Sequence, residues 1–182
     1  MIRLLLWIVS AILLGSIVHL ATILLLPYTA TQDAYTRLTP VTEVNKIALL
    51  PTAAPDGTPL PFMDPAFATA VCRYDLARGP VKLQAPVSQV YTSVSFYTPR
   101  GIAYYAINDR AGGRRVIELD LMTAKQRSQV QDDEEVTAAD RLIVESPTES
   151  GLIIVRAMSP EPNAINNVRR LLNASRCQAE KS

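Results

Sequence analysis

Residues 4–26 read LLLWIVSAILLGSIVHLATILLL and contain no Asp, Glu, Lys or Arg. About 20 helical apolar residues cross the roughly 30 Å hydrocarbon core of a bilayer, so this run is long enough to span a membrane. It predicts a single-pass anchor over residues 1–27, in contact with the lipid bilayer. A cleaved signal peptide is the alternative, although its apolar core is usually only about 7–15 residues long. Thr29-Ala30-Thr31 is a weak match to a cleavage site.

The orientation of this anchor follows from the positive charges beside it. Arg3 and the amino terminus precede the apolar run, and the next basic residue after it is Arg37. Positive charge favours the cytoplasmic side. We therefore expect a cytoplasmic N-terminus and a main domain outside; in a bacterium this means an inner-membrane protein with a periplasmic domain. The inverted topology rests on the same single arginine and stays open.

Composition limits what the rest of the chain can do. It is long enough to bury a substantial core. The whole chain has 18 Lys and Arg against 17 Asp and Glu, without a basic stripe. A nucleic-acid-binding domain would carry a basic excess, so we expect no nucleic-acid partner. The nucleotide- and zinc-binding motifs GxGxxG, Walker A and HExxH are absent from the sequence, and we expect no cofactor and no metal.

Residues 28–65 are expected to form a juxtamembrane helix and a connector. The helix is predicted over Thr29–Thr39. The connector contains Pro51, Pro55, Pro59, Pro61 and Pro65. Proline lacks a backbone N–H and fixes its φ angle, which disfavours a regular helix or a central strand here.

A period of two begins near Phe67 and predicts β-strands over residues 67–76, 81–85 and 117–121. Two hairpins are predicted over 90–107 and 142–157. Near the C-terminus the spacing becomes helical, with Ser159 as the predicted cap, Pro160 in the first turn, and Gln178–Ser182 expected to fray. Residues 66–182 are therefore predicted to form a mainly β (α+β) domain, an antiparallel β-sandwich-like fold with a C-terminal helix docked on it.

Cys72 and Cys177 are the only cysteines. An even number in an oxidising compartment favours a disulfide, here closing a loop of about 100 residues. The alternative is two unpaired thiols. Two cysteines without a nearby histidine do not make a zinc site.

Residues 66–177 also resemble a known family. The segments that carry the resemblance are Ala66–Leu76, Tyr91–Tyr97, Ile107–Arg110, Ile143–Pro147 and Gly151–Ala157. They are similar to a proteobacterial family of membrane proteins known as domain of unknown function twelve fifty-four, which is often paired with twelve fourteen. The resemblance implies a short, single-span form with an outward β-rich domain. It implies no activity and no catalytic residues.

Small and polar residues share one face of the apolar run. Ala11, Gly15, His19 and Thr22 recur at helical spacing. Small residues let a second helix approach, and an imidazole or hydroxyl can bond across the contact. This pattern predicts a docking face for another membrane protein or a second copy. The alternative is a neutral imidazole bonded to its own backbone, with small residues placed by chance.

Polar residues at predicted strand ends form a second candidate site: Asn108, Asp109, Arg110, Glu145 and Arg156. Such groups could bind a polar ligand or serve in acid–base chemistry. Turn formation is the alternative, because Asn and Asp bond their own backbone. Asp132–Glu135 is four consecutive acids without the alternating ligands of a calcium loop, and we expect a solvated linker there.

Three classes of function remain. The leading hypothesis is a non-enzymatic, membrane-anchored envelope protein that binds a protein or an envelope component. The second is an envelope hydrolase using Asp109 and Glu145; the only histidine, His19, lies in the span, which excludes a serine–histidine triad. The third is a small-ligand or lipid binder. Convergence of these carboxylates with Arg110 or Arg156 in one pocket would favour the enzyme.

Overall fold

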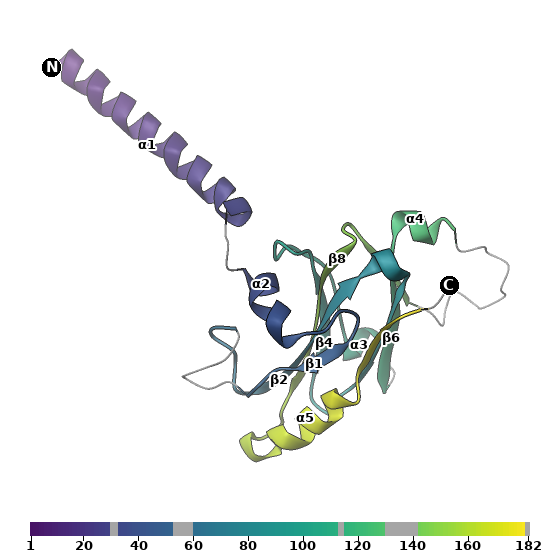
Figure 1. Cartoon of the computed structure of the whole chain (residues 1–182). Helices are drawn as coiled ribbons and strands as arrows, with labels where there is room; N and C mark the ends of the chain where they lie inside the picture. Colours follow the sequence, from purple (N-terminus) through teal and green to yellow (C-terminus); the bar gives the residue numbers. More distant parts are fainter. Residues whose placement is uncertain (30–32, 53–59, 113–114, 130–141, 181–182) are drawn as a thin grey trace. The chain divides into compact units, whose positions relative to one another are not determined.

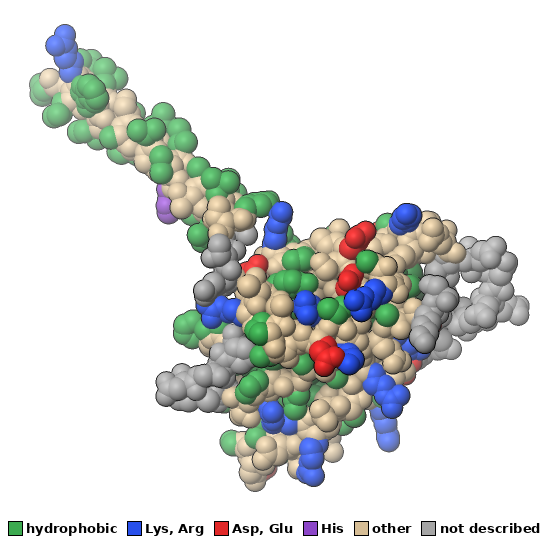
Figure 2. Space-filling model, in the orientation of Figure 1, with side chains coloured by type: hydrophobic (Ala, Val, Ile, Leu, Met, Phe, Trp, Pro, Cys, Tyr) green, Lys and Arg blue, Asp and Glu red, His purple; other side chains and the backbone are tan. Residues whose placement is uncertain are grey.

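The computed structural model describes residues 1–29, 33–52, 60–112, 115–129 and 142–180. It divides into two compact units, Met1–Asp33 and Ala34–Ser182. The first unit contains α1 (Ile2–Thr29). Its window Ile2–Leu26 has a mean hydropathy of 2.4, and none of it is buried. Hydrophobic side chains follow α1 along its visible length (Figure 2). Among the described residues, this one helix is long and apolar enough to span a membrane, a criterion that a signal sequence also meets.

The second unit is built from two β-sheets (Figure 1). Sheet A is antiparallel and has the strand order β1 (Ile47–Leu49), β2 (Phe67–Asp75), β8 (Ser150–Met158), β4 (Thr92–Tyr97) and β5 (Ala103–Asn108). Sheet B has the order β7 (Leu142–Ser146), β6 (Val116–Thr123), β3 (Val81–Pro86) and β9 (Arg176–Ala179), in which β7 pairs parallel with β6.

Short helices complete the second unit. They are α2 (Ala34–Leu38), α3 (Asp109–Gly112), α4 (Ala124–Arg127) and α5 (Ile165–Asn173), with 3-10 turns at Thr39–Val41, Leu76–Arg78 and Pro162–Ala164. Helix α5 packs against β1, β2 and β8 of sheet A and against β3 of sheet B. It contributes Val168 and Leu172 to the main core. The predicted fold class, mainly β with a docked C-terminal helix, is therefore confirmed.

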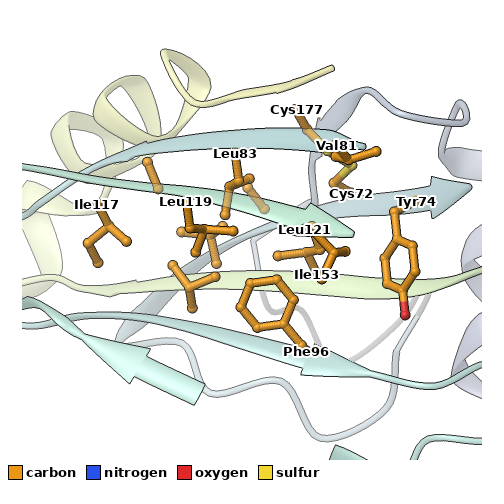
Figure 3. Packing of buried hydrophobic residues seen from close by; sticks show 14 of the residues in the cluster. Cys72, Tyr74, Val81, Leu83, Phe96, Ile117, Leu119, Leu121, Ile153 and Cys177 are labelled. Atoms are coloured by element: carbon orange, nitrogen blue, oxygen red, sulfur yellow. A yellow bond between two sulfur atoms is a disulfide. The ribbon is translucent and has the colours of Figure 1, made fainter. Parts of the chain in front are cut away.

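The core lies between the sheets and follows from the alternation of side chains along the strands. In β3, Val81, Leu83 and Ala85 are buried and the residues between them are half-buried. Phe96 and Ile153 of sheet A meet the buried leucines of sheet B (Figure 3). The period of two in the sequence thus identified the inward faces correctly.

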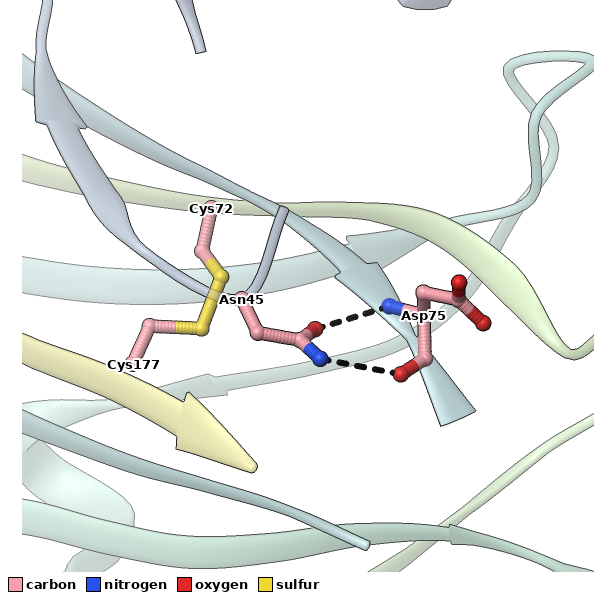
Figure 4. The surroundings of a disulfide bond; sticks show 4 residues. All are labelled: Asn45, Cys72, Asp75 and Cys177. Atoms are coloured by element: carbon pink, nitrogen blue, oxygen red, sulfur yellow. Dashed lines mark hydrogen bonds between the residues drawn. A yellow bond between two sulfur atoms is a disulfide. The ribbon is translucent and has the colours of Figure 1, made fainter. Parts of the chain in front are cut away.

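A disulfide joins the two sheets. Cys72 of β2 is bonded to Cys177 of β9, with a Cα–Cα distance of 6.4 Å across 105 positions of sequence. Asn45 lies nearby with a φ of 56°. Its side-chain amide donates to the Asp75 carbonyl (3.0 Å) and its oxygen accepts from the Asp75 amide (2.8 Å), as Figure 4 shows. The predicted disulfide is present, and the asparagine fixes the chain before β1 against the end of β2.

Part of the segment before β2 covers sheet A from outside. Leu38 and Leu50 form a second buried cluster with Val71 of β2 and Leu152 of β8. The Leu50 carbonyl also accepts a 2.7 Å hydrogen bond from Arg169 of α5. The described part of the predicted connector therefore carries a strand, β1, and an apolar contact. Pro55 and Pro59 of this connector lie outside the described residues.

The predicted hairpin over 90–107 is confirmed as β4 and β5, but the hairpin over 142–157 is wrong. Strand β7 belongs to sheet B and β8 to sheet A. The turn between them is a corner in which the Ser146 hydroxyl donates to the Thr148 carbonyl (2.6 Å). The Thr148 hydroxyl in turn donates to the Ser150 carbonyl (2.8 Å). The turn residues were recognised, but the pairing partner of each strand lies far away in the sequence.

Two predictions about the C-terminus are also wrong. Helix α5 begins at Ile165 after a 3-10 turn, and Ser159 does not cap it; the Ser159 hydroxyl donates to the Glu161 carbonyl instead. The segment predicted to fray carries part of β9, which pairs with β3 through Gln178 and Ala179. Pairing with β3 and the disulfide together hold this end of the chain.

Candidate functional site

The outer face of sheet A is hollowed beside the second cluster. Strand β4 alternates so that Thr92, Val94 and Phe96 are buried in the protein, whereas the residues between them are half-buried on the outer face. A groove of about 460 Å³ lies over β8, β4 and β5. Small-molecule sites usually enclose about 300–1,000 Å³, so the groove has the size of a ligand site. We call it the sheet-A groove.

The register of the strands explains the hollow. Ser95 of β4 lies between Ile154 of β8 and Ala106 of β5. Ser93 lies one step along, between Arg156 and Asn108. Small side chains thus occupy the middle of the groove. Larger ones also line it, namely Tyr91, Tyr97 and Tyr105.

Arg156 supplies the charge of the groove. Among the described residues that line it there is one arginine and no aspartate or glutamate. The Arg156 guanidinium carbon lies 4.4 Å from the centre of the Phe67 ring, and Phe67 meets Tyr91 edge-on with ring centres 6.5 Å apart. A guanidinium over an aromatic face gains about 0.5–2 kcal/mol and is oriented by the contact.

The sequence-predicted polar residues are only partly brought together. Asn108 and Arg156 line the same groove. Asp109 starts α3, and its Oδ1 accepts a 3.3 Å hydrogen bond from the Thr92 amide of β4. Arg110 is exposed on α3 and is absent from the described groove lining.

Glu145 lies in the other sheet. It is exposed on β7, and its carboxylate meets Arg127 of α4 at 3.6 Å. Its neighbour Ser146 is buried and bonded in the corner between β7 and β8. The two candidate carboxylates, Asp109 and Glu145, therefore do not converge on the sheet-A groove. An acid–base pair needs both groups within reach of one reacting centre.

Tyrosine hydroxyls form a buried cluster where β2, β5 and β7 meet. The Tyr74 hydroxyl lies 3.0 Å from the hydroxyls of both Tyr104 and Ser146. Burial raises the pKa of Tyr104 well above its usual range; a hydrogen bond with Ser146 lowers that pKa in part, and the contact with Tyr74 raises it. Tyr74 is fully buried. The cluster links the two sheets, and the Tyr104 hydroxyl stays protonated at neutral pH.

Metal ligation finds no support in the part of the chain that the structure describes. No group of three or more His, Cys, Asp or Glu residues is arranged to hold an ion there. The acidic run Asp132–Glu135 lies outside the described residues.

The candidate docking face lies on α1. Ala11, Gly15, His19 and Thr22 are all exposed and helical. The Thr22 hydroxyl donates to the Val18 carbonyl at 2.9 Å, and a Cβ added at Gly15 would meet nothing within 4 Å. A second helix can thus approach Gly15 without a steric barrier from the described residues.

Serines and tyrosines of the groove were missed as site residues. Alternation in the sequence already placed residues 93, 95 and 97 on one face of a strand. The predicted hairpin already paired β4 with β5, but the sequence did not show that β8 lies on the other side of β4 and brings Arg156 to Ser93 and Asn108. Tyr91 and Tyr97 belong to the segment Tyr91–Tyr97, which resembles the family, but no pattern in the sequence predicted that they line one groove with Tyr105.

The fold and the groove define a disulfide-bonded, two-sheet α+β protein with an apolar N-terminal helix. Residues 44–179 match the family described as Protein of unknown function (DUF1254), and the chain belongs to that family. The sequence resemblance to this family is thereby confirmed.

Two solved structures resemble the chain. The VPA0106 protein from Vibrio parahaemolyticus aligns with a TM-score of 0.58 and 12% identity over 81% of this chain and 34% of that one. An uncharacterized protein from Burkholderia cenocepacia aligns with a TM-score of 0.43 and 10% identity, over 76% of this chain and 46% of that one. The first likeness supports the fold alone, and this chain spans about a third of that protein's length. No curated protein matches the chain.

Proposed function

We propose that this chain is a membrane-anchored, non-enzymatic binding protein of the bacterial envelope, with α1 in the inner membrane and the two-sheet unit in the periplasm. The observation that carries the proposal is the combination of an apolar, membrane-length helix with a disulfide in the unit that follows it. Disulfides persist in oxidising compartments such as the periplasm. Arg3 before the helix favours the same orientation.

Binding is favoured over hydrolysis by the placement of the polar groups. The Asp109 carboxylate accepts a hydrogen bond from the Thr92 backbone amide, and Glu145, on a strand of the other sheet, pairs with Arg127. The sheet-A groove instead presents hydroxyl, amide and guanidinium groups beside aromatic rings. This is the composition of a recognition surface rather than of an acid–base site. A hydrolase that uses Asp109 and Glu145 together is the disfavoured alternative, because the two carboxylates do not share a reacting centre.

Membrane fractionation tests the anchoring. The full chain is expressed in a bacterium, membranes are washed with alkaline carbonate, and the mass of the retained protein is measured. We expect an intact N-terminus in the carbonate-resistant fraction. Release of the chain by carbonate, or a mature protein that begins after α1, would contradict the anchor and favour a signal peptide.

The face formed by Ala11, Gly15, His19 and Thr22 is proposed to dock a partner span or a second copy. Gly15→Leu would separate the helices at that point. Crosslinking in native membranes should then lose its product, whereas Leu5→Ala, far from this face along α1, should keep it. Unchanged crosslinking in Gly15→Leu would exclude the docking face.

The resemblance also implied a proteobacterial origin and a link to the family called twelve fourteen, and both stay predictions. Pull-down from mild-detergent membranes with mass spectrometry identifies the partner. Recovery of the chain alone would count against a larger assembly.

A further inference from the structure

We propose that the sheet-A groove binds an acidic oligosaccharide, with a sugar carboxylate paired to Arg156 and sugar rings against the groove tyrosines. This inference rests on the proposed binding function and names the class of ligand.

Charge is the first argument. Arg156 is the one charged residue among the described residues that line the groove. Its guanidinium carbon lies 4.4 Å from the Phe67 ring centre, and the Phe67 ring contacts the Tyr91 ring edge-on. Arginine presents a planar fork of N–H donors that matches a carboxylate in two parallel hydrogen bonds. A groove with one oriented cation and no lining acid favours an anionic ligand.

Side-chain chemistry is the second argument. Ser93, Ser95 and Asn108 line the groove with hydroxyl and amide groups that both donate and accept hydrogen bonds. Sugar hydroxyls need partners of this kind. Tyr91 and Tyr97 are half-exposed at the same groove, whereas the Tyr105 ring packs against Phe96 of the core. Tyrosine gives a large, amphipathic contact surface at a small cost in side-chain entropy, which suits the apolar faces of sugar rings.

Backbone pairing argues against a peptide ligand. Strand β4 pairs with β8 on one side and with β5 on the other, so its N–H and C=O groups are used in the sheet. An extended peptide gains much of its affinity by adding a strand to a free sheet edge. The middle of the groove lies over the paired strands β8 and β4, where only side chains are offered, whereas the edge of sheet A is at β5. A nucleic acid is disfavoured because the formal charge of the chain is only +1.

Titration calorimetry on the full chain in mild detergent tests the proposal. The probe is a tetrasaccharide of glucuronic acid, compared with a neutral glucose tetrasaccharide and a tetra-glutamate peptide. We expect the acidic sugar to bind at least tenfold more tightly than either comparison ligand, a difference of about 1.4 kcal/mol. Its affinity should fall as salt rises.

Matched variants locate the site. Arg156→Gln should weaken the acidic sugar about tenfold or more, and Arg156→Lys should weaken it less. Arg176→Gln makes the same change at an exposed position of β9 in sheet B and should leave the affinity unchanged. Ala106→Trp fills the groove from an exposed position of β5 and should abolish binding.

Each contrary result overturns the inference. These are no binding of the acidic sugar, equal or tighter binding of the peptide, or equal losses in Arg156→Gln and Arg176→Gln. Retention of the disulfide on non-reducing gels and of the far-ultraviolet circular dichroism spectrum shows that a variant is folded. Because the assay uses detergent and no membrane, its outcome is independent of the carbonate and topology tests of the proposed function.

Discussion

Gly151 is the position where adding a single methyl group should be most damaging. It is the second residue of β8 and lies opposite Tyr74 of β2. A Cβ built there would overlap the Tyr97 carbonyl oxygen and the Tyr74 hydroxyl, and it would lie 2.6 Å from Tyr74 Cζ. One of these neighbours is backbone and the other is a fully buried ring, so neither moves freely.

The expected cost of Gly151→Ala follows from these contacts. Overpacking a core costs about 1–3 kcal/mol. Displacing the Tyr74 hydroxyl also weakens its 3.0 Å contacts with Tyr104 and Ser146. Each such hydrogen bond contributes about 1 kcal/mol. We therefore expect Gly151→Ala to lower the free energy of unfolding by about 3–5 kcal/mol, a large part of the stability of an ordinary domain.

Urea unfolding of the full chain in mild detergent, followed by pulse proteolysis of the two-sheet unit, measures this loss. Gly101→Ala is the matched control, because a Cβ there would meet nothing within 4 Å and the only penalty comes from its φ of +78°. That penalty is about 1–2 kcal/mol. If Gly151→Ala destabilises no more than Gly101→Ala, the packing between Tyr74 and β8 has been described wrongly.

Three further outcomes are expected. Replacing both Cys72 and Cys177 by Ala should cost about 4–5 kcal/mol by the chain-entropy model, measured by urea unfolding, and an unchanged midpoint would argue against the bridge. Asn45→Ala removes two hydrogen bonds to Asp75 at a left-handed position and should cost about 2–3 kcal/mol, whereas Asn45→Asp keeps one acceptor and should cost less; equal losses would refute this. The pKa of Tyr104 is raised in the folded state, so the unfolded chain loses the tyrosine proton at a lower pH than the folded chain. The free energy of unfolding should therefore fall as pH rises above about 10. Tyr104→Phe should reduce that fall between unfolding measurements at pH 9 and pH 11, and an identical fall in the variant would contradict the burial of this hydroxyl.

The fold was predictable where a local pattern decides it. Alternation in β3 and β6 identified the buried faces, and the turn before Ile102 identified the β4–β5 hairpin. Pairing between distant segments was not predictable. Strand β7 looked like the partner of β8, but it pairs in parallel with β6 instead. Strand β9 is short and polar and becomes a strand only through its pairing with β3.

In the candidate site too, local features were predictable from the sequence and contacts between distant segments were not. Arg156 and Asn108 were recognisable as polar residues at predicted strand ends. They lie on either side of Ser93 because β8 pairs with β4, and no periodicity in the sequence predicts that pairing. Glu145 looked equivalent to them in the sequence. It belongs to sheet B and pairs with Arg127.

The most direct test of the account is the side of the membrane on which the two-sheet unit lies. Alkaline phosphatase, which needs an oxidising compartment, and a fluorescent protein that matures in the cytosol are each fused after Ser182 of the full chain. The account predicts phosphatase activity without fluorescence, together with a Cys72–Cys177 bridge that resists thiol capping in intact cells. Fluorescence without phosphatase activity would contradict it.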